Sequence, residues 1–215
     1  MCARCIKQRG MEDVFPEVAA EPAAEPPPAA SKRPADLVDL ATLDASLRLD
    51  IRYATPHNFM RRVLYPSARA LLQRPAAEAL LRVHAALAAS GLGLVVFDAY
   101  RPWSVTKAMW DETAEEERLF VADPQLGSKH NRGCAVDVGL CERTTGAELP
   151  MPSAFDEFTE RAYADYAGAA EPEARNRGLL RAAMEREGFA VNPKEWWHFD
   201  YHLWEEYEVM DMPLE

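Results

Sequence analysis

The sequence predicts a single-domain α+β fold with a mainly antiparallel central sheet flanked by helices. Its 215 residues contain no internal repeat and suffice for one domain with a substantial core. Helical and extended patterns both occur, but they do not alternate regularly as they would in a parallel βαβ fold. Hydrophobic residues make up 48% and charged residues 27% of the chain, as in an ordinary globular protein.

Residues 1–35 are expected to form a disordered tail, and residues 36–215 the folded domain. Ala, Pro and Glu dominate from Val18 to Pro34, so this stretch offers few large apolar groups and loses backbone donors at its prolines. Cys2 and Cys5 form a C-x-x-C pair in the tail, but no second pair completes a zinc site. We interpret this pair as incidental.

The first half of the domain begins with a predicted strand over 47–53, where apolar and charged residues alternate. Next, a proline in the first turn and an apolar face predict a helix over 75–90, which the following glycine ends. His84 lies on the apolar face and is expected to pack there rather than to bind a metal. The unbroken apolar run 94–97 predicts a central strand.

The second half is predicted to contain three helices and two strands. We expect helices over 104–119, 155–167 and 176–187, the last ended by a glycine. Segments 135–140 and 195–201 are rich in residues that favour strands. Together with the earlier elements, they complete the expected α+β domain.

The charge and the cysteines indicate where the protein works. A formal net charge of −11 argues against nucleic acid as a partner. No run of about eighteen apolar residues and no signal peptide is evident, so neither a membrane span nor secretion is expected. The four cysteines are too few for a disulfide framework, which favours the cytoplasm, and Cys134 and Cys141 are expected to be small buried residues. The oligomeric state stays open, a homo-oligomer included.

His130 and Asp137 are the first candidate metal ligands. They lie on either side of Gly133, which permits a turn that brings their side chains together. This spacing alone is a weak indication, because a His and an Asp occur at such a distance in many proteins.

Glu195 and His198 supply the rest of a possible metal centre. In a regular strand these two residues would point to opposite faces, so we expect a bend or bulge there. Two imidazoles and one carboxylate suit zinc, and three protein ligands leave a fourth position for water. Glu195 would then be the base that removes a proton from that water.

Arg101 is the candidate for stabilising an oxyanion. A buried guanidinium aimed at the developing charge contributes several kcal/mol to such a reaction. The alternative is a surface ion pair between Arg101 and Asp98 at the end of the strand.

These residues fall in motifs that resemble the VanX-type D-alanyl-D-alanine dipeptidases, zinc D,D-peptidases of the M15 family. Five stretches occur in the family's order from about Leu37 to Tyr207. They are Tyr53-Ala-Thr-x-x-Asn58-Phe59, Asp98-x-Tyr100-Arg101-Pro102, Ser128-x-His130-x-x-Gly133-x-Ala135-x-Asp137, the helix from Asn176-Arg177 to Gly188-Phe189, and Glu195-Trp196-Trp197-His198.

The resemblance implies a fold similar to that of hedgehog domains and one zinc ion per chain, bound by His130, Asp137 and His198. It implies that Glu195 is general base and then acid, and that Arg101 stabilises the transition state. The implied substrate is the small dipeptide D-alanyl-D-alanine. Whether hydrolysis serves vancomycin resistance or the recycling of peptidoglycan dipeptide from the cell wall stays open.

Three further residues are implied to hold the amino end of the dipeptide: Ser128, Asp156 and Tyr53. An acidic group there would select dipeptides, because the peptide nitrogen of a longer chain carries no charge to pair with it. For Asp156, a position at the start of the predicted helix 155–167 is the alternative explanation.

Two other functions remain open. A zinc D,D-carboxypeptidase that trims peptidoglycan stem peptides would use the same metal centre in an open cleft. A zinc-binding module without catalysis would not need Glu195 or Arg101.

Overall fold

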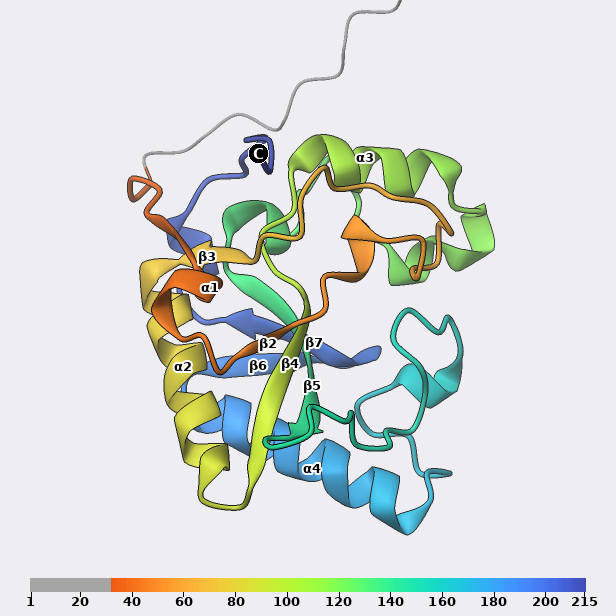
Figure 1. Cartoon of the computed structure of the whole chain (residues 1–215). Coiled ribbons are helices and arrows are strands. Elements are labelled where there is room, and N and C mark those ends of the chain that lie inside the picture. The colour runs from red at the N-terminus through yellow and green to blue at the C-terminus, as the bar shows by residue number, and fades with distance from the viewer. Residues whose placement is uncertain (1–31) are drawn as a thin grey trace, which may run out of the picture.

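The computed structural model describes residues 32–215, which fold around a five-stranded sheet (Figure 1). Its strand order is β2-β4-β5-β7-β6. The pair β2 and β4 is parallel and the other three pairs are antiparallel, which confirms the predicted fold class. The strands are β2 (Arg48–Leu49), β4 (Leu92–Asp98), β5 (Ala135–Glu142), β7 (Glu195–Tyr201) and β6 (Phe189–Asn192).

A second, two-stranded sheet was not apparent from the sequence. Its antiparallel strands are β1 (Leu37–Asp39) and β3 (Leu71–Gln73), and a short helix, α1 (Leu40–Leu43), follows β1. The Gln73 backbone N–H donates to the Gly133 carbonyl at 2.8 Å, and its side-chain amide donates to the Arg132 carbonyl at 3.0 Å. The small sheet therefore supports the segment that carries His130.

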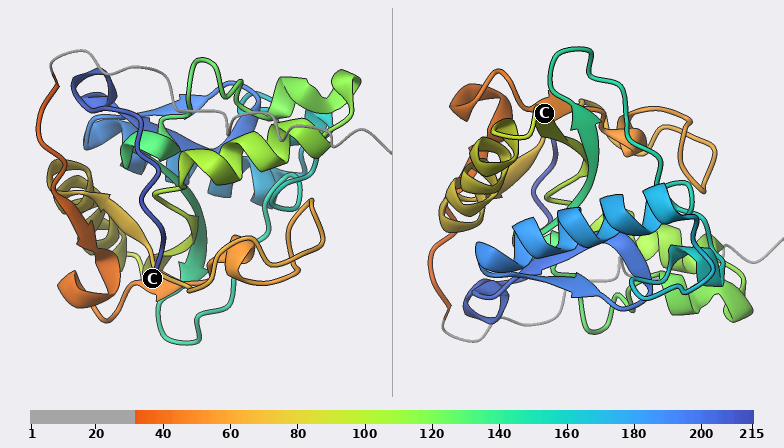
Figure 2. Two further views of the ribbon diagram at one scale, coloured as in Figure 1. Left: turned by 90° about the horizontal axis from the view of Figure 1, so that it is seen from above. Right: turned by 90° about the horizontal axis from the view of Figure 1, so that it is seen from below.

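Two long helices pack against the central sheet and against each other (Figures 1 and 2). Helix α2 (Arg74–Ala88) lies on β4, and helix α4 (Glu171–Arg186) lies on β6. The first agrees with its prediction. The second begins five residues earlier than predicted, where the Ala170 N–H donates to the Glu173 carboxylate at 3.0 Å. His84 is buried in α2 and accepts a hydrogen bond from the Leu94 N–H at 3.1 Å, so the expected packing role is confirmed.

The predicted helix over 104–119 is shorter in the structure. Helix α3 spans Trp103–Glu112, and a separate 3-10 segment, η2, spans Glu115–Phe120. The Thr113 hydroxyl donates to the Met109 carbonyl at 2.7 Å and so satisfies one of the last carbonyls of α3. The helix ends there, and Phe120 belongs to the separate segment η2.

The predicted helix over 155–167 was wrong. The segment consists of turns and one short 3-10 helix, η4 (Glu160–Ala162). Asp156 has a φ of +59°, a left-handed conformation that cannot continue a right-handed helix. Because no helix starts there, the alternative explanation of Asp156 as a helix N-terminal carboxylate is also wrong.

The strand predicted over 47–53 is confined to β2. After the Asp50 N–H donates to Val96, the chain leaves the sheet and turns into the 3-10 segment η1 (Arg52–Ala54). The Tyr53 carbonyl accepts hydrogen bonds from the backbone of Leu64 at 2.8 Å and of Tyr65 at 2.9 Å. These tertiary hydrogen bonds, which no local pattern reveals, replace those of the expected strand.

Most of the expected tail over residues 1–35, with Cys2 and Cys5, lies outside the described residues. Within residues 32–35, the Arg33 N–H donates to the Glu206 carbonyl at 2.8 Å, so this end lies against the domain. Cys134 and Cys141 are buried and free, as expected. From residue 32 onward, no helix is long and apolar enough to cross a membrane.

Candidate metal centre

His130, Asp137 and His198 bring their side chains to one point. His130 Nε2 lies 3.0 Å from His198 Nδ1 and 3.3 Å from Asp137 Oδ1. His198 Nδ1 lies 3.0 Å from the same carboxylate oxygen. All three residues are buried, and their ligand atoms lie within 4.8 Å of one another. Two imidazole nitrogens and one carboxylate oxygen so placed fit the donor set of a catalytic zinc ion.

The local fold explains this convergence. Asp137 on β5 and His198 on β7 are direct partners in the antiparallel pairing, so their side chains leave the same face of the sheet. His130 lies in the 3-10 turn η3 (His130–Arg132), which Gly133 ends with a φ of +66°. A Cβ atom on Gly133 would lie 2.5 Å from Leu37 Cδ2. The turn predicted at Gly133 is thus present and needs glycine.

The remaining ring nitrogen of each histidine has its own partner. His130 Nδ1 lies 2.6 Å from the Ala99 carbonyl, and His198 Nε2 lies 2.9 Å from Asp200 Oδ1. Asp200 in turn pairs with Lys129 Nζ at 3.3 Å. Such contacts fix the ring orientation and leave the other nitrogen free for a metal. Asp200 was missed, although its i+2 spacing from His198 on a strand indicated a shared face.

Glu195 reaches the same point through an irregularity in the sheet. Val191 pairs with Phe199 but its neighbour Asn192 pairs with Glu195, so β7 bulges between the two pairs. Glu195 Oε2 comes within 3.8 Å of His198 Nδ1 and accepts a hydrogen bond from the Asn192 side chain at 2.7 Å. The expected irregularity is confirmed. Burial raises the pKa of Glu195 above its usual range.

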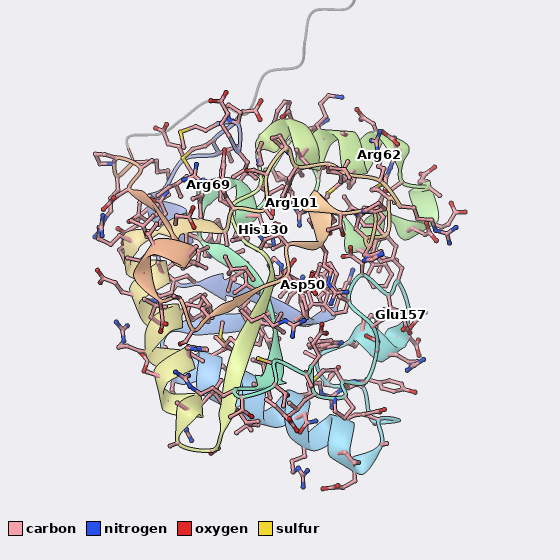
Figure 3. The ribbon with its side chains drawn as sticks, viewed as in Figure 1. Asp50, Arg62, Arg69, Arg101, His130 and Glu157 are labelled. Carbon is pink, nitrogen blue, oxygen red and sulfur yellow. The ribbon has the colours of Figure 1, made fainter. Side chains whose placement is uncertain are left out.

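Arg101 follows β4 and is held by a buried carboxylate. Its Nε and Nη2 donate to Asp98 Oδ2 at 3.1 and 2.7 Å, while the Tyr65 hydroxyl donates to Asp98 Oδ1 at 2.7 Å. Arg101 Nη2 also lies 4.0 Å from Asp137 Oδ2. Figure 3 shows Arg101 beside His130, to whose carbonyl its backbone N–H donates. The ion pair with Asp98 is present, but inside the protein and not on its surface.

Asp156 and Tyr53 form a second polar group. The Tyr53 hydroxyl donates to Asp156 Oδ1 at 3.0 Å, and the Phe59 N–H donates to Oδ2 at 3.4 Å. Removal from water, followed by repulsion from Asp137, raises the pKa of Asp156 to about 8. Burial thus favours the protonated form of this carboxyl group, while Arg101 and the hydrogen bonds from Tyr53 and Phe59 favour the ionised form.

Ser128 is buried next to the first histidine of the centre. Its hydroxyl accepts a hydrogen bond from the His130 N–H at 3.2 Å, and its own N–H donates to Asn131 Oδ1 at 2.7 Å. Ser128 therefore shapes the turn that presents His130.

All eight site residues expected from the sequence line one cavity of about 240 Å³. This volume lies below the roughly 300–1,000 Å³ typical of pockets for drug-sized ligands, so the cavity suits a small ligand. Trp197 also lines the cavity. The eight residues are Tyr53, Arg101, Ser128, His130, Asp137, Asp156, Glu195 and His198.

A cavity lined by two histidines, an aspartate and a further glutamate, carried by this α+β fold, is the arrangement expected of a metallopeptidase. Comparison with known proteins identifies its family. The chain belongs to the Peptidase M15 family, described as D-ala-D-ala dipeptidase, which matches residues 33–205.

Relatives from several bacteria carry the same description. The chain is 37% identical over 165 residues to a D-alanyl-D-alanine dipeptidase of Escherichia coli, covering 77% of this chain and 84% of that protein. It is 34% identical over 171 residues to a D-alanyl-D-alanine dipeptidase of Enterococcus faecium, covering 71% of this chain and 85% of that one. Activity toward D,D-peptides is therefore a property of this chain's family.

Solved structures with partial similarity include two vancomycin-resistance D,D-peptidases. The vancomycin-resistance D,D-dipeptidase VanXYg, in complex with a D-Ala-D-Ala phosphinate analog, has a TM-score of 0.42 and 23% identity over 61% of this chain and 51% of that one. The D,D-pentapeptidase VanY, in complex with Zn(II), has a TM-score of 0.41 and 18% identity over 64% of this chain and 76% of that one.

Proposed function

We propose that this protein hydrolyses the dipeptide D-alanyl-D-alanine to two D-alanines with one zinc ion per chain. The observation that carries the proposal is the joint placement of three metal-type ligands and Glu195 in the wall of one small cavity. The family described as D-ala-D-ala dipeptidase supports the choice of substrate.

His130, Asp137 and His198 would hold the zinc. When bound, zinc supplies Lewis acidity, which polarises a carbonyl group and makes water a stronger nucleophile at neutral pH. The contacts of the two histidines with Ala99 and Asp200 keep their ligand nitrogens directed to the centre.

Glu195 would take a proton from the attacking water and give it to the leaving amine. Its raised pKa brings the carboxylate closer to the working pH, which favours a group that must both accept and return a proton. The hydrogen bond from Asn192 holds one oxygen of Glu195 in place.

Arg101 would stabilise the negative charge that develops on the carbonyl oxygen. Asp98, which itself accepts a hydrogen bond from Tyr65, fixes the guanidinium, so little reorganisation is needed during the reaction. Arg101 lines the cavity from the side of β4.

Asp156, Tyr53 and Ser128 would hold the amino end of the dipeptide. The ammonium group of the substrate would favour the ionised form of Asp156, whose pKa burial raises to about 8. A peptide nitrogen would leave that carboxyl group without a charged partner.

The test is release of D-alanine from D-alanyl-D-alanine by the purified protein, with added zinc and after treatment with a chelator. We expect activity that the chelator removes and zinc restores. L-alanyl-L-alanine serves as the control for chirality. Equal cleavage of an N-acylated tripeptide ending in D-Ala-D-Ala would instead favour the D,D-carboxypeptidase, and no hydrolysis of any of these peptides would refute the proposal.

A further inference from the structure

Three phenylalanines from separate parts of the chain meet at the cavity. Phe59 follows η1, Phe120 ends η2, and Phe158 lies shortly before η4. The ring centroids of Phe59 and Phe158 are 4.9 Å apart, and those of Phe158 and Phe120 are also 4.9 Å apart with an interplanar angle of 10°. All three side chains line the cavity and are half-buried. We call them the phenylalanine stack.

The stack stands next to Asp156. The Phe59 N–H donates to the Asp156 carboxylate, and Phe158 follows Asp156 by two residues. Because Asp156 is the carboxylate proposed to hold the amino end of the dipeptide, the rings lie beside the proposed place of that amino end.

The three rings of the stack can separate from one another at low energetic cost. Ring stacking rests on packing and weak electrostatics, so separating the rings leaves no buried polar group without a partner. The Phe120 ring also lies 6.4 Å from the Tyr163 ring, which continues the aromatic contacts toward η4. Thus the rings join three segments that the central sheet does not connect.

We propose that the phenylalanine stack sets the length of peptide that the cavity accepts. Closed, it leaves room for a dipeptide whose ammonium pairs with Asp156 and blocks chains extended at the amino end. The inference rests on the proposed function, because it concerns which peptides reach that centre. It assigns this selection to three rings in addition to the charge of Asp156.

The experiment compares two peptides, D-alanyl-D-alanine and an N-acylated tripeptide ending in D-Ala-D-Ala. The ratio of kcat/KM for the tripeptide to that for the dipeptide is measured in the wild type, Phe120→Ala and Phe158→Ala. We expect the ratio to rise at least about tenfold in both variants. Phe120→Tyr keeps a ring in place and should retain the wild-type ratio. Leu126→Ala, an exposed residue of the segment that follows Phe120, serves as the matched surface control.

A second readout does not depend on hydrolysis. The rate at which a bulky coloured chelator extracts zinc reports access to the cavity, and it should rise about tenfold in Phe120→Ala but not in Leu126→Ala. Circular dichroism and thermal unfolding establish that each variant is folded.

The outcomes separate the two proposals. An unchanged peptide ratio together with an unchanged extraction rate in folded Phe120→Ala and Phe158→Ala would overturn the role of the stack. A wild type that cleaves neither peptide, while zinc extraction still accelerates in Phe120→Ala, would refute the proposed function and leave the stack as a barrier to the cavity.

Discussion

Asp137 and His198 face each other as direct partners across β5 and β7, with a carboxylate oxygen 3.0 Å from a ring nitrogen. The backbone pairing of the sheet thus sets the separation of two proposed ligand atoms. Only the third proposed ligand, His130, is placed by a turn outside the sheet. A site built on paired strands is positioned more rigidly than one carried by loops alone.

Asp200 should control metal affinity through His198. Its carboxylate accepts a hydrogen bond from His198 Nε2, which fixes the ring and makes the opposite nitrogen a better ligand. In Asp200→Asn, zinc affinity should fall roughly 10–100-fold, the usual effect of losing such a partner. Competition with a coloured chelator measures the zinc affinity. The control is Asp165→Asn, the same change at an exposed aspartate. Equal affinities in the two variants would contradict the role of Asp200.

Glu195→Gln should abolish most of the activity without releasing the metal. The amide has the shape of the carboxylate but cannot accept and return a proton, so kcat should fall by roughly 10²–10⁴-fold. Zinc content measured on the purified variant should equal that of the wild type. Activity within a few-fold of the wild type would show that another group is the base.

Asp156→Asn should weaken binding of the free dipeptide. Loss of a hydrogen bond to a charged group costs about 1.5–3 kcal/mol, or roughly 10–100-fold in KM. The difference in kcat/KM between D-alanyl-D-alanine and its N-acetyl derivative should shrink accordingly. If the variant discriminates between these two peptides as strongly as the wild type does, Asp156 does not bind the amino end.

Gly133→Ala should destabilise the protein more than Gly91→Ala. Both glycines have a positive φ, +66° and +71°, so the strain of a left-handed alanine is common to the two variants. A Cβ atom at Gly133 would also lie 2.5 Å from Leu37 Cδ2, whereas at Gly91 no atom lies within 4 Å. Overpacking should add about 1–3 kcal/mol to the cost at Gly133. Urea unfolding of the two variants gives the difference directly.

His84 should make stability depend on pH. Burial, followed by repulsion from Arg143, lowers the pKa of His84. The folded state therefore resists a proton that the unfolded chain accepts near pH 6.5, so this contribution is present above that pH and is lost as the pH falls below it.

The test for His84 is urea unfolding of the wild type and His84→Gln from pH 7.5 to pH 5. Glutamine can still accept the hydrogen bond from the Leu94 N–H. The wild type should lose stability relative to the variant as the pH falls. Parallel curves for the two proteins would show that His84 does not titrate in this way.

The sequence was most informative about long, strongly patterned elements and the side chains they carry. Residues that favour strands were enough to predict the strand over 195–201. A proline in the first turn and an apolar face were enough to predict the helix from Pro75. The structure contains both elements, as β7 and α2. The bulge before His198 was deduced from a chemical requirement, namely that Glu195 and His198 share one site.

The secondary-structure predictions were wrong where tertiary contacts outweigh the local conformational preference of the sequence. The segment 155–167 has a helical pattern, yet Asp156 takes a left-handed conformation and is held by Tyr53 and Phe59, which are distant in sequence. No periodicity encodes such contacts. Similarly, the two-stranded sheet of β1 and β3 consists of segments too short to show a pattern.

The pairing of Asp137 with His198 has a thermodynamic consequence. A zinc ion held by β5, β7 and the turn at His130 would bind only the folded chain and would therefore tie these elements together. By mass action, free zinc at about 100 times its dissociation constant adds about 2.7 kcal/mol to the stability of a protein. The concentration of free zinc would then set the stability of the folded protein as well as its activity.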